Sequence, residues 1–258
     1  MLPLVLLAGM NCTDDLWADA AIEGAVRPVL DRPSVAEQVE ALRAALPERF
    51  VLVGHSLGAI VAMALAAVAP ERLGGLCLVS TNAKAPTDTQ RDGWREWLAQ
   101  LDEGVDAQTL QSRILPALLG TDAVRDRPDL VERTLAMGTD TGGTRLRAQL
   151  HLQLSRGDLL ASLPGIATPT LVVSGLDDAI CPPHFHTEIV QRMPDARLVT
   201  LDAGHLLPLE RGQAFDALLR SWRAGLEGAG AGAVSGTSRG FGRRSQPRAE
   251  EFGASIRP

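Results

Sequence analysis

Short aliphatic segments alternate with longer amphipathic ones along most of this chain, and this alternation limits the possible folds more than any other feature. Polar and apolar residues do not alternate strictly in the short segments. Such a lack of alternation is typical of strands that are buried on both faces. We expect six such strands, at residues 2–7, 25–30, 50–53, 76–79, 170–174 and 196–201. Helical patterns lie among them, at residues 35–46, 57–69, 184–193 and 213–226. The alternation predicts an α/β protein with a mostly parallel, doubly wound sheet and helices on both faces.

Two stretches depart from this rhythm. Between about residues 85 and 163 no segment resembles a strand, and apolar side chains recur at helical spacing, as in Trp94, Trp97, Leu98 and Leu101. We expect an all-helical insertion there, within a domain that spans residues 1–227. Residues 228–258 are rich in Gly, Ser and Arg with almost no apolar periodicity, so we expect a disordered tail.

The bulk composition excludes several classes of protein. With 258 residues and a formal net charge of −6, the chain is long enough for one large domain and too acidic to favour nucleic acid as a partner. No apolar run is long enough to span a membrane, and the apolar N-terminus lacks the basic residues of a signal peptide. Cys12, Cys77 and Cys181 have no metal-ligand spacing, so we expect reduced, buried thiols in a cytoplasmic protein. The scarcity of lysine suggests a bacterial source.

A Gly-x-Ser-x-Gly pattern occurs twice, around Ser56 and around Ser238. Ser56 follows an expected strand and precedes an expected helix, whereas Ser238 lies in the Gly-rich tail. A sharp strand-to-helix turn holds a serine in a strained, exposed conformation, and the flanking glycines allow the close crossing that this turn requires. We therefore predict that Ser56 is a nucleophile.

A serine hydroxyl needs a base, and His205 is the best candidate among the five histidines. It follows a strand directly, where parallel sheets place reactive groups. His184 and His186 lack a third metal ligand, so we expect them to be surface polar residues and expect no metal. The acid that orients the base should come from Asp177 or Asp178 at the end of another strand, and the residues themselves leave that choice open.

Four separated motifs resemble those of the α/β-hydrolase superfamily. They are LLAGMNC with the downstream Trp17, GHSLG, SGLDD followed by Cys-Pro-Pro, and DAGHLLPLE. The resemblance covers residues 1 to about 226 and includes the order Ser, Asp, His. Two features depart from the family pattern: the chain lacks the two opening antiparallel strands, which leaves about six strands, and Ala8-Gly9 replaces the common His-Gly pair.

The resemblance also implies roles for individual residues. Similar proteins place the acid three residues after the strand-end glycine, which selects Asp178. The resemblance assigns the oxyanion hole to the backbone N–H groups of Met10 and Leu57, with Asn11 close by as a substrate-binding residue. Trp94 and Trp97 of the helical insertion are further candidates for contact with the substrate.

The expected activity is hydrolysis of a small carboxylic ester or related acyl substrate, without a cofactor. The runner-up is a carbon–carbon bond hydrolase of a diketone-like acid, for which the resemblance implies an arginine near the pocket. Arg91, Arg95 and Arg145 are the candidates for that residue. A non-catalytic binding protein on the same scaffold is the third possibility. The oligomeric state stays open.

Overall fold

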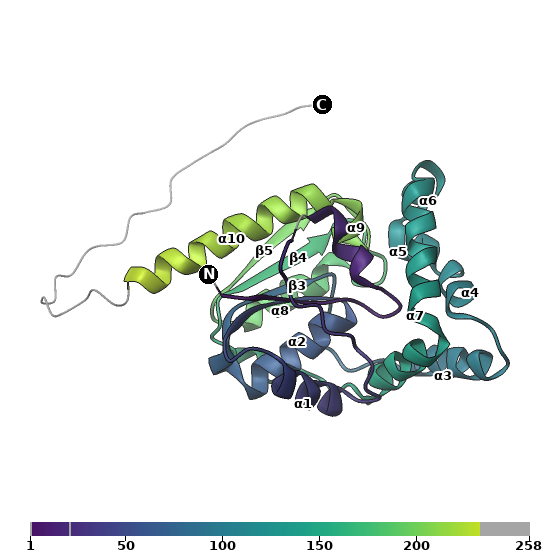
Figure 1. Cartoon of the computed structure of the whole chain (residues 1–258), viewed down its shortest axis with the longest axis horizontal. Helices are drawn as coiled ribbons and strands as arrows, with labels where there is room; N and C mark the ends of the chain where they lie inside the picture. The colour runs from purple at the N-terminus through teal and green to yellow at the C-terminus, as the bar shows by residue number, and fades with distance from the viewer. Residues whose placement is uncertain (1, 21, 233–258) are drawn as a thin grey trace, which may run out of the picture.

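The computed structural model describes residues 2–20 and 22–232, and its centre is a parallel sheet (Figure 1). The five strands lie side by side in chain order, each parallel to its neighbours. They are β1 (Leu4–Leu7), β2 (Phe50–His55), β3 (Leu73–Val79), β4 (Thr170–Gly175) and β5 (Ala196–Leu201). Because the strands are parallel, all their carboxyl ends meet at one edge, where the segments that follow them come together.

The expected sixth strand at residues 25–30 does not form. Only Val26 pairs with β1, through its N–H to Leu4 and its C=O to the amide of Leu6, both at 2.9 Å. Two residues later Pro28 has no N–H to donate, and Val29 is 46% exposed. A proline and a solvent-facing valine end the pairing after one residue, so the sheet has five strands instead of about six.

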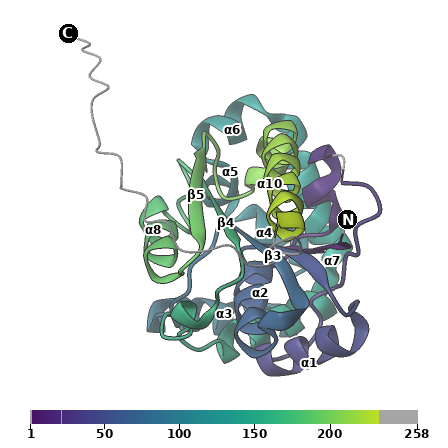
Figure 2. The same cartoon turned by 90° about the vertical axis from the view of Figure 1, so that its left-hand side faces the viewer.

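Alternate residues of the strands face two separate hydrophobic cores. One face packs against α1 (Val35–Ala45), α2 (Leu57–Val68) and α8 (Pro183–Arg192). The other packs against η1 (Asp14–Ala20) and α10 (Gly212–Gly232), with the short α9 (Leu207–Glu210) beside them. Figures 1 and 2 show α10 and the α1–α2 pair on opposite sides of the strands. The doubly wound α/β fold predicted from the sequence is confirmed.

Helices fill the expected insertion between β3 and β4. They are α3 (Asp88–Asp102), α4 (Ala107–Ser112), α5 (Leu115–Leu119), α6 (Thr121–Asp126) and α7 (Pro128–Ser155), followed by η3 (Leu163–Gly165). Helices α3–α7 form a cap that lies to one side of the sheet (Figure 1). Helix α7 is interrupted at Gly142, whose φ of 68° is not helical. The cap has its own small core, in which Leu101 packs with Leu110, Leu146 and Leu150.

The start of helix α1 follows a local sequence signal. Ser34 caps α1 by accepting a hydrogen bond from the amide of Glu37 at 3.2 Å, as its position before the apolar pattern predicts.

A short η2 (Pro70–Arg72) connects α2 to β3. Helix α10 continues to Gly232, five residues past the expected end of the domain at residue 227. The remainder of the expected tail, residues 233–258, lies outside the described residues.

The crossing of α2 over β1 generates the first prediction. A Cβ on Gly58 would lie 2.2 Å from the carbonyl oxygen of Leu7, which is rigid backbone. A Cβ on Gly93, in helix α3, would meet nothing within 4 Å. We expect Gly58→Ala to lower the melting temperature by several degrees, because strand and helix must separate. Gly93→Ala should raise it slightly, since alanine favours a helix by up to about 1 kcal/mol.

Calorimetry of the three proteins measures both effects. A Gly58→Ala protein that melts at the wild-type temperature would show that the crossing is looser than the structure describes. The Gly93→Ala protein controls for the general effect of adding a methyl group to a helix.

Candidate active site

Ser56 lies at the sharp turn between β2 and α2. Its backbone has φ 51° and ψ −114°, a conformation that residues other than glycine rarely adopt. The turn is tight because Gly54 packs against Ala59 and Gly58 packs against Leu7, at distances that leave no room for a Cβ. The amide of Ser56 donates to the carbonyl of Val79 at 2.9 Å, which fixes the turn to β3. The serine is therefore held in a strained position at the carboxyl edge of the sheet.

A chain of hydrogen bonds connects Ser56 to two residues from distant loops. The Nε2 atom of His205 is 3.0 Å from the Ser56 hydroxyl. On the other side of the ring, Nδ1 is 2.9 Å from Oδ2 of Asp178. Asp177 is exposed, and its amide donates to Ala203 without its side chain approaching the ring. The structure thus brings together Ser56, His205 and Asp178.

Asp178 is held as an anion despite being almost fully buried. Burial alone would raise its pKa, but the His205 ring and two backbone amides outweigh that effect and lower it below the ordinary value. The amides of Ile180 and Cys181 donate to Oδ1 at 2.9 Å and 2.7 Å. Since a carboxylate accepts only, Nδ1 of His205 carries the proton, and Nε2 is left free to accept one from Ser56.

Two backbone amides beside Ser56 have no acceptor in the part of the chain that the structure describes. They belong to Leu57, at the first turn of α2, and to Met10, in the loop after β1. The Met10 loop lies against the serine, because a Cβ on Gly9 would be 3.3 Å from the Cβ of Ser56. Free N–H groups at a helix start favour negative charge nearby. These two amides are therefore the candidates for an oxyanion hole.

The structure places Asn11 among the residues that line the cavity at Ser56, and its polar groups also contact the cap. Its side chain donates to the carbonyl of Ala107 in the cap at 3.0 Å, and its own amide donates to Oε1 of Gln149 in α7 at 2.8 Å. The residue is only 1% exposed and adopts φ 56°. Gln149 in turn donates to Leu30 at 3.3 Å. Its backbone N–H and one side-chain N–H are therefore occupied by the cap, and these two bonds tie the loop that carries Met10 to α4 and α7.

Two buried histidines support the site, and sequence reasoning missed both. His55 is fully buried, and its Nε2 donates to the carbonyl of His205 at 2.8 Å, which holds the loop of that residue. Burial lowers its pKa to about 3, so it stays neutral. The expectation that His186 is a surface residue is wrong. It is fully buried, its Nε2 accepts from the amide of Thr81 at 2.9 Å, and burial lowers its pKa to about 4.

Glu210 is a buried carboxyl group behind the His205 loop. Its Oε2 accepts from the amide of Gly204 at 2.9 Å, while Oε1 is buried without a hydrogen-bond partner. Burial raises its pKa to about 7. Asp202, by contrast, is exposed and pairs with Arg211 at 3.3 Å. Glu210 therefore anchors the backbone next to His205 but does not touch the imidazole.

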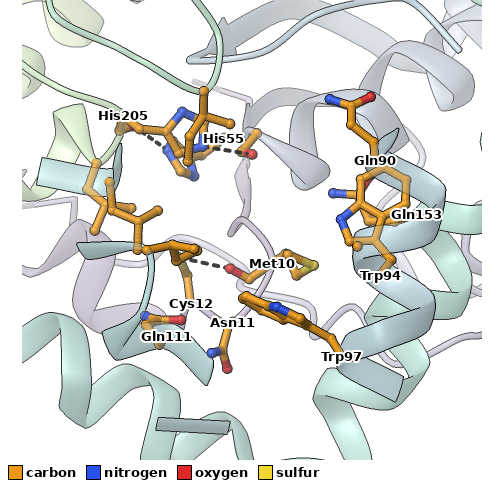
Figure 3. Close-up of a pocket in the computed structure, with 16 residues that line it drawn as sticks. Met10, Asn11, Cys12, His55, Gln90, Trp94, Trp97, Gln111, Gln153 and His205 are labelled. Carbon is orange, nitrogen blue, oxygen red and sulfur yellow. Dashed lines mark hydrogen bonds between the residues drawn. The ribbon is translucent and has the colours of Figure 1, made fainter. Parts of the chain in front are cut away.

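A cavity of about 270 Å³ opens at Ser56 and His205, beneath the cap. Its wall is mostly apolar, with Trp94 and Trp97 of α3 facing it (Figure 3). Both tryptophans are only partly buried, and besides lining the cavity they pack on the cap core. The polar side chains around the cavity are mainly amides, from residues Gln90, Gln111 and Gln153.

None of the three arginines considered from the sequence lines this cavity. Arg95 pairs with Asp92 on the exposed face of α3 at 2.8 Å. Arg145 faces a separate cavity beyond the Met10 loop, next to Asp140. Arg91 donates to the carbonyl of Leu154 at 3.3 Å, behind the cavity wall.

Neither a metal centre nor a membrane-spanning helix is found in the described part of the chain. Residues 2–20 and 22–232 hold no group of three His, Cys, Asp or Glu residues arranged for a metal ion. The described helices include none that is both long and apolar enough to cross a bilayer. All three cysteines are free and buried, as the sequence predicts.

Comparison with known proteins gives one consistent result. The family model for the alpha/beta hydrolase fold matches residues 29–212. A pimeloyl-[acyl-carrier protein] methyl ester esterase from Aeromonas hydrophila is 32% identical, with 71% of this chain and 72% of that protein covered. A putative carbamate hydrolase from Klebsiella pneumoniae is 29% identical, covering 71% and 69%. A thermophilic esterase from Thermogutta terrifontis has a similar fold, with a TM-score of 0.77, 23% identity and coverage of 88% and 90%.

The raised pKa of Glu210 predicts how stability changes with pH. In the unfolded chain this carboxyl group ionises near its ordinary value of 4.5, but in the folded protein it keeps its proton up to about pH 7. The folded state binds more protons between these values, so its stability falls as pH rises through that window. Glu210→Gln keeps an acceptor for Gly204 and removes the ionisation.

We therefore expect the free energy of unfolding of Glu210→Gln to rise relative to wild type between pH 5 and pH 8, by an amount on the order of 2 kcal/mol, which is measured as a higher melting temperature. Taking the difference between the two proteins cancels the effect of His55 and His186, which destabilise both as pH falls below about 6.5. A difference that stays constant across pH would show that Glu210 is ionised normally in the folded protein.

Proposed function

Because this chain belongs to the alpha/beta hydrolase fold family and is one of its enzymes, we propose that it is a serine hydrolase that cleaves a small carboxylic ester through an acyl-enzyme on Ser56. The observation that carries the proposal is the hydrogen-bonded series from Ser56 through His205 to Asp178, at 3.0 Å and 2.9 Å. In that series the Asp178 carboxylate accepts from Nδ1 of His205, which leaves Nε2 in position to accept the proton of Ser56.

In this mechanism the Ser56 hydroxyl attacks the ester carbonyl while its proton moves to Nε2 of His205. The resulting oxyanion accepts hydrogen bonds from the amides of Met10 and Leu57, which contribute about 3 kcal/mol each. The tetrahedral intermediate collapses, and His205 returns the proton to the departing alcohol. Water then attacks the acyl-enzyme by the same route in reverse, with Asp178 stabilising the imidazolium in both steps.

The cavity supports a small substrate with an apolar portion. Its volume of about 270 Å³ is near the lower end for small-molecule sites, and Trp94 and Trp97 offer flat apolar surfaces. Two of the related proteins are named for a methyl ester and for a carbamate, and both of these substrates have an acyl carbon as the point of attack. A carbon–carbon bond hydrolase would require the same catalytic residues, and a screen of esters of different chain length separates the two reactions.

Replacing the proposed nucleophile tests the function directly. Ser56→Ala should lower ester hydrolysis by about 10³-fold or more and abolish covalent labelling by a fluorophosphonate probe, because no other hydroxyl has the His205 base beside it. Ser238→Ala, which alters the second Gly-x-Ser-x-Gly match, is the matched control and should behave as wild type. Persistent labelling of Ser56→Ala would refute the assignment, and an unlabelled wild-type protein would favour a non-catalytic binding protein.

The neighbouring carboxylates provide a second test. In Asp178→Asn the side-chain oxygen can still accept from Ile180 and Cys181, so the amide group would face Nδ1 of His205. The imidazole would then carry its proton on Nε2 and could not accept one from Ser56. We expect kcat to fall by about 10³-fold or more. Asp177→Asn should cost about tenfold at most, since that side chain is exposed.

Steady-state kinetics on both variants, with circular dichroism to verify folding, measures the difference. Equal losses in the two variants would mean that the turn, and not one carboxylate, supports catalysis.

A further inference from the structure

Arg156 is a buried cation without an anionic partner. The residue is 6% exposed, and no carboxylate lies within ion-pair distance of its guanidinium among residues 2–20 and 22–232. Its Nε is buried and has no hydrogen-bond acceptor. Burial, with a smaller effect of the nearby Arg91 guanidinium, lowers its pKa to about 10, so it remains charged at neutral pH. Buried charges are normally paired, so this one needs an explanation.

The contacts of Arg156 lead directly to the proposed active site. Its guanidinium lies 5.2 Å from the ring centre of Trp94 and donates through Nη1 to Oε1 of Gln153 at 2.9 Å. Its Nη2 is 3.4 Å from Oε1 of Gln90. Trp94, Gln153 and Gln90 all line the cavity that holds Ser56. Together with Arg156 we call them the cationic wall, and Figure 3 shows its three lining members on the side of the cavity across from His205.

Arginine also determines how the two amides are oriented. A guanidinium only donates hydrogen bonds, so the oxygen of each glutamine must face it and the NH₂ group must face away. Oε1 of Gln90 accepts a second bond, from the amide of Thr87 at 3.0 Å. The Nε2 groups of Gln90 and Gln153 have no protein acceptor in the described part of the chain. One wall of the cavity therefore has two free NH₂ groups, those of Gln90 and Gln153, and the positive charge of Arg156 lies directly behind them.

We propose that the cationic wall binds a free carboxylate of the substrate, so that the preferred substrates are esters carrying a second, anionic carboxyl group. This inference rests on the proposed function and specifies its substrate class. The two NH₂ groups would donate to the carboxylate oxygens, and Arg156 would supply the compensating charge across the amides. Gln90 is exposed, whereas Gln153 and Arg156 are buried, and an electrostatic interaction is stronger at such buried groups than at an open surface.

Matched pairs of esters test the proposal. Mono-p-nitrophenyl esters of succinate, glutarate and adipate carry the second carboxylate at increasing distance from the scissile bond. The p-nitrophenyl esters of butyrate, pentanoate and hexanoate have the same chain lengths without it. We expect kcat/KM to favour the anionic member by tenfold or more at the best length, because of a lower KM. The neutral esters test the serine mechanism separately.

Gln153→Glu is the sharpest variant, because it should preserve or improve the local fold. The new carboxylate would pair with Arg156 and place an acceptor where the substrate carboxylate should bind. We expect kcat/KM for the anionic esters to fall at least tenfold more than for the neutral esters. Arg156→Met should shift the same ratio in the same direction. Arg95→Met, which removes an exposed arginine of α3, is the control and should leave the ratio unchanged.

Calorimetric binding of glutarate and of its uncharged diamide, glutaramide, keeps the test independent of turnover. Tighter binding of glutarate by wild type, lost in Gln153→Glu, supports the proposal. Equal ratios in wild type, Gln153→Glu and Arg156→Met would overturn it and leave Arg156 with a purely structural role. Loss of hydrolysis of the neutral esters in wild type would instead refute the serine mechanism, while the binding comparison would still decide on the carboxylate.

Discussion

The contact between the start of α2 and the end of β1 is the constraint on which the rest of the site depends. Gly58 lies against the carbonyl of Leu7 at a distance that no side chain could share. This contact forces the backbone into the strained turn at Ser56 and also brings the loop after β1 beside the serine. The free amides of Leu57 and Met10 consequently lie near each other, although 46 residues separate them in the sequence. One close packing contact thus arranges both the proposed nucleophile and the groups that would stabilise charge.

A second layer of buried polar residues holds the loops that meet at this edge. His55 binds the carbonyl of His205, Glu210 binds the amide of Gly204, and His186 binds the amide of Thr81. Each of these three groups is neutral at moderate pH, or nearly so, because burial disfavours its charged form. The loops are therefore fixed by hydrogen bonds whose cost of burial is smaller than that of ion pairs. His205 depends on two of them for its position.

Local patterns in the sequence predicted five of the strands, the turn at Ser56 and the loop position of His205, whereas they left Asp177 and Asp178 open and only the family resemblance selected Asp178. Each of these features is specified by residues within a few positions of one another, such as the glycines around Ser56. The missing strand at residues 25–30 shows the limit of that approach. The aliphatic residues there predicted a strand, although Pro28 cannot donate the hydrogen bond that a strand at this position requires. The roles of Asn11, His186 and Arg156 depend on partners 96 to 138, 105 and 66 residues away, respectively. No short-range pattern encodes such contacts, so the sequence could not predict them.

The hydrogen bonds of Asn11 to Ala107 and Gln149 fasten the loop after β1 to the cap, so a displacement of the cap would also displace this loop. A cap of this kind is often regarded as an exchangeable module that sets specificity while the sheet performs the chemistry. Here a new cap with a different register at position 149 would also displace the amide of Met10. If related proteins exchanged their caps, the substrate preference of the new cap would be gained only if a compatible residue at position 11 came with it. Replacing the whole cap would therefore disturb the position of the Met10 amide, whereas substitutions in the cavity wall would leave the bonds of Asn11 in place.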